Sequence, residues 1–163
     1  KPEVLAQYAQ IGSAYAKYVM GINNPRIGLL NIGSEEGKGN LTAKATYKLL
    51  KELDNINFIG NIEGGDCSDT EKVDVIVTDG FVGNIYLKHA ESIYSILKQR
   101  GINDPFFDNY NYENVGGTPA LGVNGTVIIG HGKSNGKAIK NMILQTKAVA
   151  AAKLHEKIAS IIK

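Results

Sequence analysis

The chain has 163 residues, a length that suits one compact domain with its own hydrophobic core. Its 18 basic and 16 acidic residues nearly balance, which gives no charge-based case for binding nucleic acid. A single cysteine fits a reducing compartment, and no apolar run reaches the roughly 18 residues that span a bilayer. We therefore expect a cytoplasmic protein without a nucleic acid partner.

Apolar periodicity predicts the elements in chain order. A helix is expected over 4–20, with Pro2 in its first turn and Gly21 directly after it. Short apolar runs predict buried strands at 27–32, 58–59, 73–77 and 126–129, and helical spacing predicts helices over 41–53, 83–99 and 135–162. The stretch 103–117 lacks periodicity and is expected to be a loop. Apolar strands that alternate with helices indicate a single α/β domain over 1–163, with a mostly parallel sheet sandwiched by helices.

The first unusual loop, 33–40, lies between a predicted strand and a predicted helix that Asn40 would cap. Its glycine amides, the helix dipole and the charge of Lys38 would together form a cradle for an anion. The loop is one residue too short for a Walker A motif, and Gly39 stands where a serine or threonine would hold magnesium. Nucleotide binding is therefore disfavoured, and the alternative is a tight turn with a solvated lysine.

Two further loops follow predicted strands. In 79–84, Asp79 either orients a polar group of a substrate or caps the next helix, and Asn84 lies near that helix's start. Lys88 shares a helical face with Asn84, pointing into a site or pairing with a surface acid.

In 130–135, His131 is flanked by glycines and is a candidate acid, base or polarising group. Ser134 or Asn135 would cap the last helix. The histidines and the cysteine lack the spacing of metal ligands, so we predict no metal site.

Several segments, taken together and in this order, resemble the PlsX family of acyl-ACP:phosphate acyltransferases. They are 24–33, 35–40, 57–64, 73–75, 79–84, 116–117, 121–125 and 131–141. The resemblance implies a fold like that of isocitrate and isopropylmalate dehydrogenases, with a cleft between two lobes. It also implies a homodimer that acts in phospholipid synthesis without a metal or an organic cofactor. Its substrates would be acyl carrier protein and inorganic phosphate, and its product would pass to a membrane glycerol-3-phosphate acyltransferase.

Placed on this family's reaction, the three loops receive specific roles. Lys38 and the backbone amides of 37–40 would bind phosphate, while Asn84 and His131 would stabilise the oxyanion or protonate the departing thiolate. Asp79 would orient one of these donors. The expected substrate contacts are Gly37, Gly39, Asn40, Lys88, Asn124, Ser134 and Asn135.

This sequence also departs from the family pattern. The family's N-terminal half is missing and the chain does not begin with methionine, so we expect the C-terminal part of a longer enzyme, inactive by itself. Only 101–115 fills the place of a longer amphipathic segment thought to touch the membrane, which leaves peripheral membrane association open. Two alternatives remain: a phosphotransacetylase-type enzyme that uses a short acyl-CoA, and a non-catalytic half for dimerisation or carrier docking. The lysines of the last helix would attract acidic carrier protein or form an ordinary solvated face.

Overall fold

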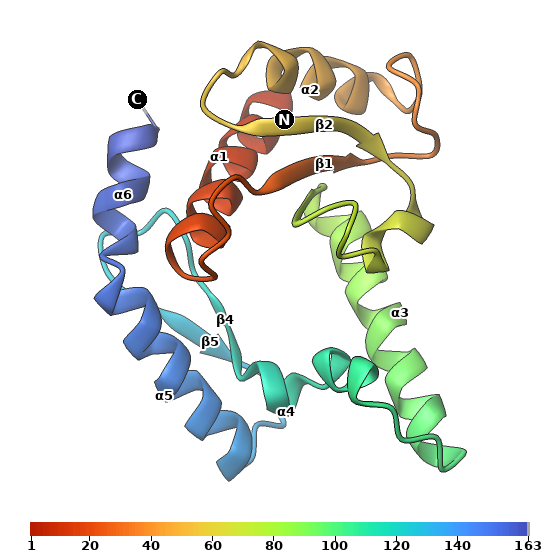
Figure 1. Cartoon of the computed structure of the whole chain (residues 1–163), viewed down its shortest axis with the longest axis vertical. Coiled ribbons are helices and arrows are strands. Elements are labelled where there is room, and N and C mark those ends of the chain that lie inside the picture. The colour runs from red at the N-terminus through yellow and green to blue at the C-terminus, as the bar shows by residue number, and fades with distance from the viewer. Residues whose placement is uncertain (163) are drawn as a thin grey trace. The chain divides into compact units, whose positions relative to one another are not determined.

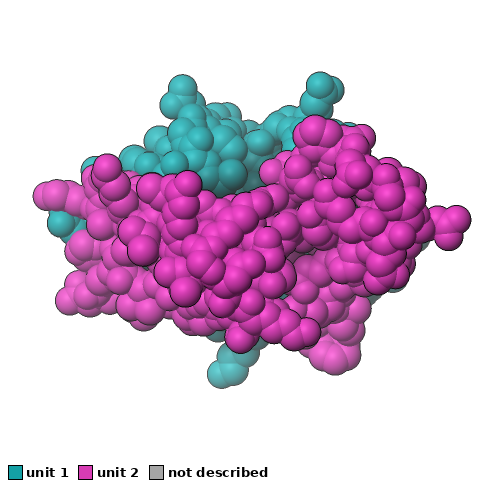
Figure 2. All heavy atoms as spheres, turned by 90° about the horizontal axis from the view of Figure 1, so that it is seen from below, with its two compact units in different colours: residues 1–79, 156–163 teal, residues 80–155 magenta. Residues whose placement is uncertain are grey.

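The computed structural model describes residues 1–162 (Figure 1), which form two compact units (Figure 2). Unit 1 comprises Lys1–Asp79 together with the C-terminal segment that starts at Glu156, and unit 2 comprises Gly80–His155.

Unit 1 is built around a parallel sheet of three strands in the order β2-β1-β3. Its elements are α1 (Pro2–Tyr18), β1 (Arg26–Leu30), α2 (Leu41–Glu52), β2 (Asn57–Ile62), the short 3-10 helix η1 (Gly64–Ser68) and β3 (Val75–Val77). The predicted helices at 4–20 and 41–53 and the first three predicted strands are confirmed. Gly21 follows α1 with a φ of 76°, a conformation that glycine adopts readily.

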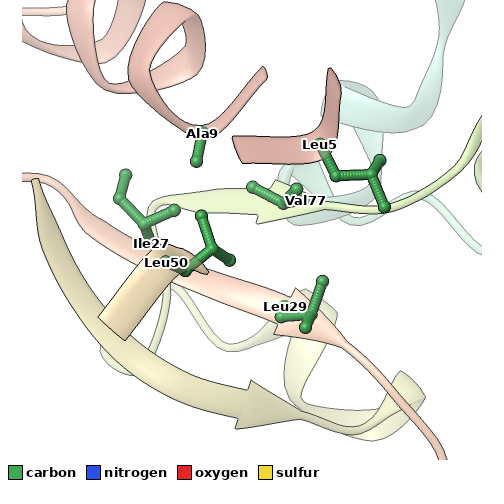
Figure 3. Close-up of a cluster of buried hydrophobic side chains, with 6 residues drawn as sticks. All are labelled: Leu5, Ala9, Ile27, Leu29, Leu50 and Val77. Atoms are coloured by element: carbon green, nitrogen blue, oxygen red, sulfur yellow. The ribbon is translucent and has the colours of Figure 1, made fainter. Parts of the chain in front are cut away.

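The core of unit 1 lies on one face of this sheet. Because side chains alternate along a strand, Ile27 and Leu29 of β1 point to the same side, where Val77 of β3 joins them. Both flanking helices cover that side, α1 through Leu5 and Ala9 and α2 through Leu50 (Figure 3). Full burial of a large aliphatic side chain contributes roughly 1.5–3 kcal/mol.

A bulge changes the direction of the side chains at the end of β2. Ile27 pairs with Phe58, but the next residue of β1, Gly28, pairs with Gly60, so Ile59 is an extra residue without a partner on β1. Gly60 adopts a φ of 97° within the bulge. As a result Asn61 lies opposite Leu29, on the face that the helices cover.

A charged pair joins the beginnings of β1 and β3. Arg26 donates to the Asp74 carboxylate through Nε at 2.8 Å, through Nη2 at 2.9 Å and through its backbone amide at 2.7 Å. These bonds hold the pKa of Asp74 below its ordinary value although burial opposes the shift. The guanidinium also donates to the carbonyls of Thr70 and Glu71, which fixes the chain leading into β3.

Unit 2 combines helices with a two-stranded sheet. It contains α3 (Gly80–Gln99), the 3-10 helix η2 (Pro105–Tyr110), α4 (Tyr112–Val115), β4 (Gly117–Pro119), β5 (Ile128–Gly130) and α5 (Gly136–Ala151), and the last helix, α6 (Leu154–Ile161), begins there. β4 and β5 pair antiparallel. Gly116 and Gly117 allow close packing, since a Cβ would lie 2.7 Å from the Met142 amide nitrogen at Gly116 and 2.6 Å from Ile128 Cγ2 at Gly117.

Four details of the predicted layout are wrong. The strand expected at 126–129 pairs antiparallel in a separate sheet, because an apolar run does not specify its partner. The stretch 103–117 contains η2 and α4, each begun by a capping side chain, Asp104 and Asn111 respectively. α3 starts at Gly80, three residues before the predicted start. The last helix is split near Lys153, whose φ of 48° lies outside helical geometry.

The predicted α/β class with a parallel sheet flanked by helices is confirmed in unit 1, and the dehydrogenase-like fold stays a prediction. Within residues 1–162, no helix combines the length and the hydropathy needed to cross a membrane.

Candidate functional site

The 33–40 loop of unit 1 connects the end of β1 to the start of α2. Asn40 caps α2 as predicted, its Oδ1 accepting a hydrogen bond from the Ala43 amide at 2.8 Å. The Lys38 amide donates to the carbonyl of Glu35 at 3.1 Å, which closes a turn. Within the described part of the chain, the amides of Gly37, Gly39 and Asn40 have no protein acceptor. These three donors, placed just before a helix, are available to an anion.

The charge of Lys38 is only weakly held by the protein. Its side chain is 49% exposed, and its Nζ lies 3.9 Å from Oε1 of Glu35. An exposed pair at that distance contributes little. The neighbouring Glu36 pairs instead with Lys51 at 3.1 Å, which removes one competing acid from the loop. Lys38 can therefore turn toward a bound anion without losing a strong partner.

Asp79 ends unit 1, two residues after the end of β3. Because β3 runs parallel to β1, the carboxyl ends of both strands lie at the same edge of the sheet. Asp79 and the 33–40 loop thus both follow strands at this edge.

Unit 2 holds a pocket of about 380 Å³ lined by α3, α4, the end of η2 and the β4–β5 pair. Three of the predicted site residues line it, namely Asn84, Lys88 and His131. Its apolar wall includes Leu87, Ala90, Val115 and Ile129. A hollow that is mostly apolar with a few converging polar groups is the usual form of a small-molecule site.

His131 is held from two directions. Its ring stacks on that of Tyr112, with the centroids 4.7 Å apart and the planes inclined by 27°. The backbone amide of Lys133 donates to Nδ1 at 3.2 Å. Since Nδ1 accepts this bond, the proton of the neutral ring resides on Nε2, which makes Nε2–H a donor. The sequence does not single out Tyr112, because 103–117 lacks periodicity; the one local signal is Asn111, whose side chain caps α4.

Lys88 lies on the pocket wall next to an acidic partner. It forms an ion pair with Glu91 at 2.8 Å, one turn further along α3, and both residues line the pocket. The pair places one positive and one negative group on the same wall.

The other three predicted residues of unit 2 are not among the described residues that line the pocket. Asn135 caps α5 by accepting from the Ala138 amide at 3.1 Å and donates to Glu113 at 2.8 Å. Ser134 donates to the His131 carbonyl at 2.7 Å. Asn124 is exposed between β4 and β5. In this arrangement Ser134 and Asn135 brace the His131 loop.

Among residues 1–162, no three or more histidine, cysteine, aspartate or glutamate side chains are grouped so that they could hold a metal ion.

The fold and the two candidate sites define an α/β protein with a glycine-containing loop of unpaired backbone amides at the edge of a parallel sheet and a mixed polar and apolar pocket in a second unit. The sequence model of the family described as fatty acid synthesis protein matches residues 1–157. The chain belongs to this family, and the predicted PlsX membership is confirmed.

Curated relatives carry the name phosphate acyltransferase. The protein from Clostridium perfringens strain SM101 is 46% identical over 175 residues, covering 96% of this chain and 50% of the relative. That from Salinibacter ruber is 39% identical over 169 residues, covering 92% and 50%, and that from Wolinella succinogenes is 45% identical over 177 residues, covering 97% and 53%. The chain thus spans about half the length of the curated relatives it matches. Because 175 residues are matched to part of a 163-residue chain, the Clostridium perfringens protein carries residues within the matched region that this chain lacks.

Proposed function

We propose that this chain is the C-terminal half of a phosphate acyltransferase that moves a fatty acyl group from acyl carrier protein onto inorganic phosphate. The observation that carries the proposal is its identity of 39–46% to phosphate acyltransferases over more than nine tenths of its length. The two sites supply the chemical groups that such a reaction needs. In this proposal, the chain works within one α/β enzyme, as a homodimer in the cytoplasm.

Phosphate would be bound in unit 1 at the 33–40 loop. The amides of Gly37, Gly39 and Asn40 are available as donors, and Lys38 would supply a full positive charge. The N-terminus of α2 adds a favourable dipole for a dianion. Because the Lys38 amide is engaged by Glu35, we assign the backbone contacts to the other three residues.

The reaction itself needs little covalent help from the protein. A phosphate oxygen attacks the thioester carbonyl carbon, a C–O bond forms, and the C–S bond breaks as the carrier's thiolate departs. The proton of monohydrogen phosphate balances the reaction when the thiolate becomes a thiol. The protein's task is to hold the two reactants in line and to stabilise the oxyanion formed in between.

Two groups of the pocket in unit 2 are of the kind that can donate hydrogen bonds to an oxyanion. Asn84 carries an amide, and the tautomer of His131 gives an Nε2–H. We assign His131 to hydrogen bonding with the oxyanion through Nε2–H. In the alternative role, proton delivery to the thiolate, the ring would first have to take up the proton that monohydrogen phosphate gives up. Asp79, next to α3 in the chain, would orient one of these donors, and Lys88 would contact the anionic substrate. Direct attack of this kind leaves no acyl group on the protein.

An acyl-phosphate assay tests the function. The chain is mixed in trans with the separately produced other half of the Clostridium perfringens phosphate acyltransferase, and acyl-phosphate is trapped with hydroxylamine. Formation of acyl hydroxamate from acyl-ACP and phosphate is the expected result, and each half alone is the control. Product from acetyl-CoA but not from acyl-ACP would establish the phosphotransacetylase-type alternative. Stable association of the halves without any product would establish a non-catalytic role in dimerisation or docking. Either outcome would overturn the proposal, as would a stable acyl group on Cys67 or on a serine.

A further inference from the structure

Two asparagine side chains connect the 33–40 loop to the ends of β1 and β2. Asn31 directly follows β1, and its Nδ2 donates to the carbonyl of Lys38 at 3.2 Å and to Oδ1 of Asn61 at 3.1 Å. Nδ2 of Asn61 donates in turn to the carbonyl of Glu35 at 2.8 Å. Oδ1 of Asn31 accepts from the Ile32 amide at 2.9 Å. The pair therefore binds the loop at two carbonyls, those of Glu35 and Lys38.

The bulge in β2 is what brings Asn61 into this network. With Ile59 as the extra residue and Gly60 at a φ of 97°, Asn61 lies opposite Leu29 on the helix-covered face. Among residues 1–162 it is one of two buried polar or charged residues, with only 6% of its surface exposed. Bulges often re-aim a side chain beside a functional site. A buried amide is stable only when its hydrogen bonds are made, and here the loop carbonyl and Asn31 satisfy it.

Gly39 fits closely against the same network. A Cβ on Gly39 would lie 2.4 Å from Oδ1 of Asn31 and 2.9 Å from Cβ of Ala43. The loop and the amide pair are thus packed as one assembly, in which the position of Asn31 determines how closely the backbone at Gly39 approaches.

From these contacts we infer that Asn31 and Asn61 are positioning residues for phosphate: they hold the 33–40 loop in the shape that points the amides of Gly37, Gly39 and Asn40 at one anion. The inference rests on the proposed function, because it takes phosphate as the ligand of this loop. Neither side chain needs to touch the anion, since both bond to carbonyls on the protein side of the loop.

The test compares the unchanged chain with Asn61→Ser and Asn31→Ser, all labelled with nitrogen-15. Serine is too short to reach the loop carbonyls but remains polar. Asn57→Ser is the matched control, because Asn57 lies on the same strand at the opposite end of the register, where β1 begins. Inorganic phosphate is titrated in while the amide resonances of the loop are followed. Hydrogen exchange of the same amides is measured separately without phosphate, and core amides around Leu50 report whether unit 1 remains folded.

We expect Asn61→Ser and Asn31→Ser to raise the phosphate concentration at half saturation about tenfold, the effect of losing one such contact. Exchange of the loop amides should accelerate while the core amides stay protected, and Asn57→Ser should match the unchanged chain. Equal phosphate binding by Asn61→Ser and the unchanged chain would overturn the positioning role. If phosphate shifts no loop amide of the unchanged chain, the proposed phosphate site fails. Hydrogen exchange distinguishes a failure of the positioning role from a failure of the phosphate site. It is measured without phosphate and shows directly whether the two asparagines stabilise the conformation of the loop.

Discussion

Alanine at position 39 should destabilise the 33–40 loop far more than alanine at position 37. Gly39 has a φ of 89°, and an alanine in left-handed geometry costs roughly 1–2 kcal/mol. Its Cβ would lie 2.4 Å from Asn31 Oδ1, so the Asn31 amide would have to move. That movement sacrifices its bonds to the Ile32 amide and the Lys38 carbonyl, each contributing about 1 kcal/mol. The sum predicts that Gly39→Ala lowers the free energy of unfolding of unit 1 by about 3–4 kcal/mol.

Gly37→Ala is the matched control for this prediction. Gly37 lies in the same loop without a left-handed φ, and a Cβ there would meet nothing within 4 Å. Gly37→Ala should change the free energy of unfolding of unit 1 by no more than about 0.5 kcal/mol. Urea unfolding is followed by nitrogen-15 cross-peaks of β1 and β2, because the two units need not unfold together. Coincident midpoints for the two variants would refute the conclusion that Asn31 and Gly39 pack as one assembly.

Three further predictions concern the core, the charged pair and the pocket. Leu50→Ala should destabilise unit 1 by about 2–5 kcal/mol in the same urea assay, because Leu50 is fully buried between α2 and the sheet; a loss below 1 kcal/mol would contradict this packing. The lowered pKa of Asp74 means that its pair with Arg26 contributes stability above the unfolded-state pKa of about 3.9 and loses it as pH falls through the folded-state pKa. Asp74→Asn should therefore lower the urea midpoint at pH 7. Below about pH 3.9 the difference in midpoint between the variant and the unchanged chain should become smaller. A difference that stays constant with pH would show that the pair does not contribute pH-dependent stability. In the neutral ring of His131, nitrogen-15 spectra should show Nδ1 without a proton; a protonated Nδ1 would contradict the bond from Lys133.

The elements predicted best are those whose own sequence contains both periodicity and a terminator. α1 begins at Pro2 and is followed by Gly21, and α2 starts after Asn40, so the local sequence specifies their ends. The split between α5 and α6 at Lys153 is marked by neither glycine nor proline, so the local sequence gives no warning of it. The antiparallel pairing of β5 depends on β4, a three-residue strand too short to produce a periodic signal.

In the candidate site, too, the residues on regular elements are predictable from the local sequence, and those that depend on strand pairing are not. Asn84, Lys88 and His131 were predicted from loop positions and helical spacing, and they line one pocket because α3 and the end of β5 are regular elements. The sequence does not indicate a role for Asn61, because the direction of its side chain depends on the bulge at Gly60. Glycine in a strand hints at a bulge, but the register shift that follows is a property of the paired strands.

The tautomer of His131 bears on which chemistry the pocket can perform. In serine hydrolases Nδ1–H donates to a carboxylate, which leaves Nε2 free to accept the proton of the nucleophile. Here a backbone N–H from Lys133 occupies Nδ1, so the neutral ring presents Nε2–H and cannot accept a proton there. A nucleophile that required deprotonation would therefore be poorly served by this histidine. Phosphate is already an anion at neutral pH and requires no such base, whereas the oxyanion and the departing thiolate both require donors. The hydrogen bond at Nδ1 thus fits the donor role that the proposed function gives His131, and it does not fit the role of a base that activates a serine.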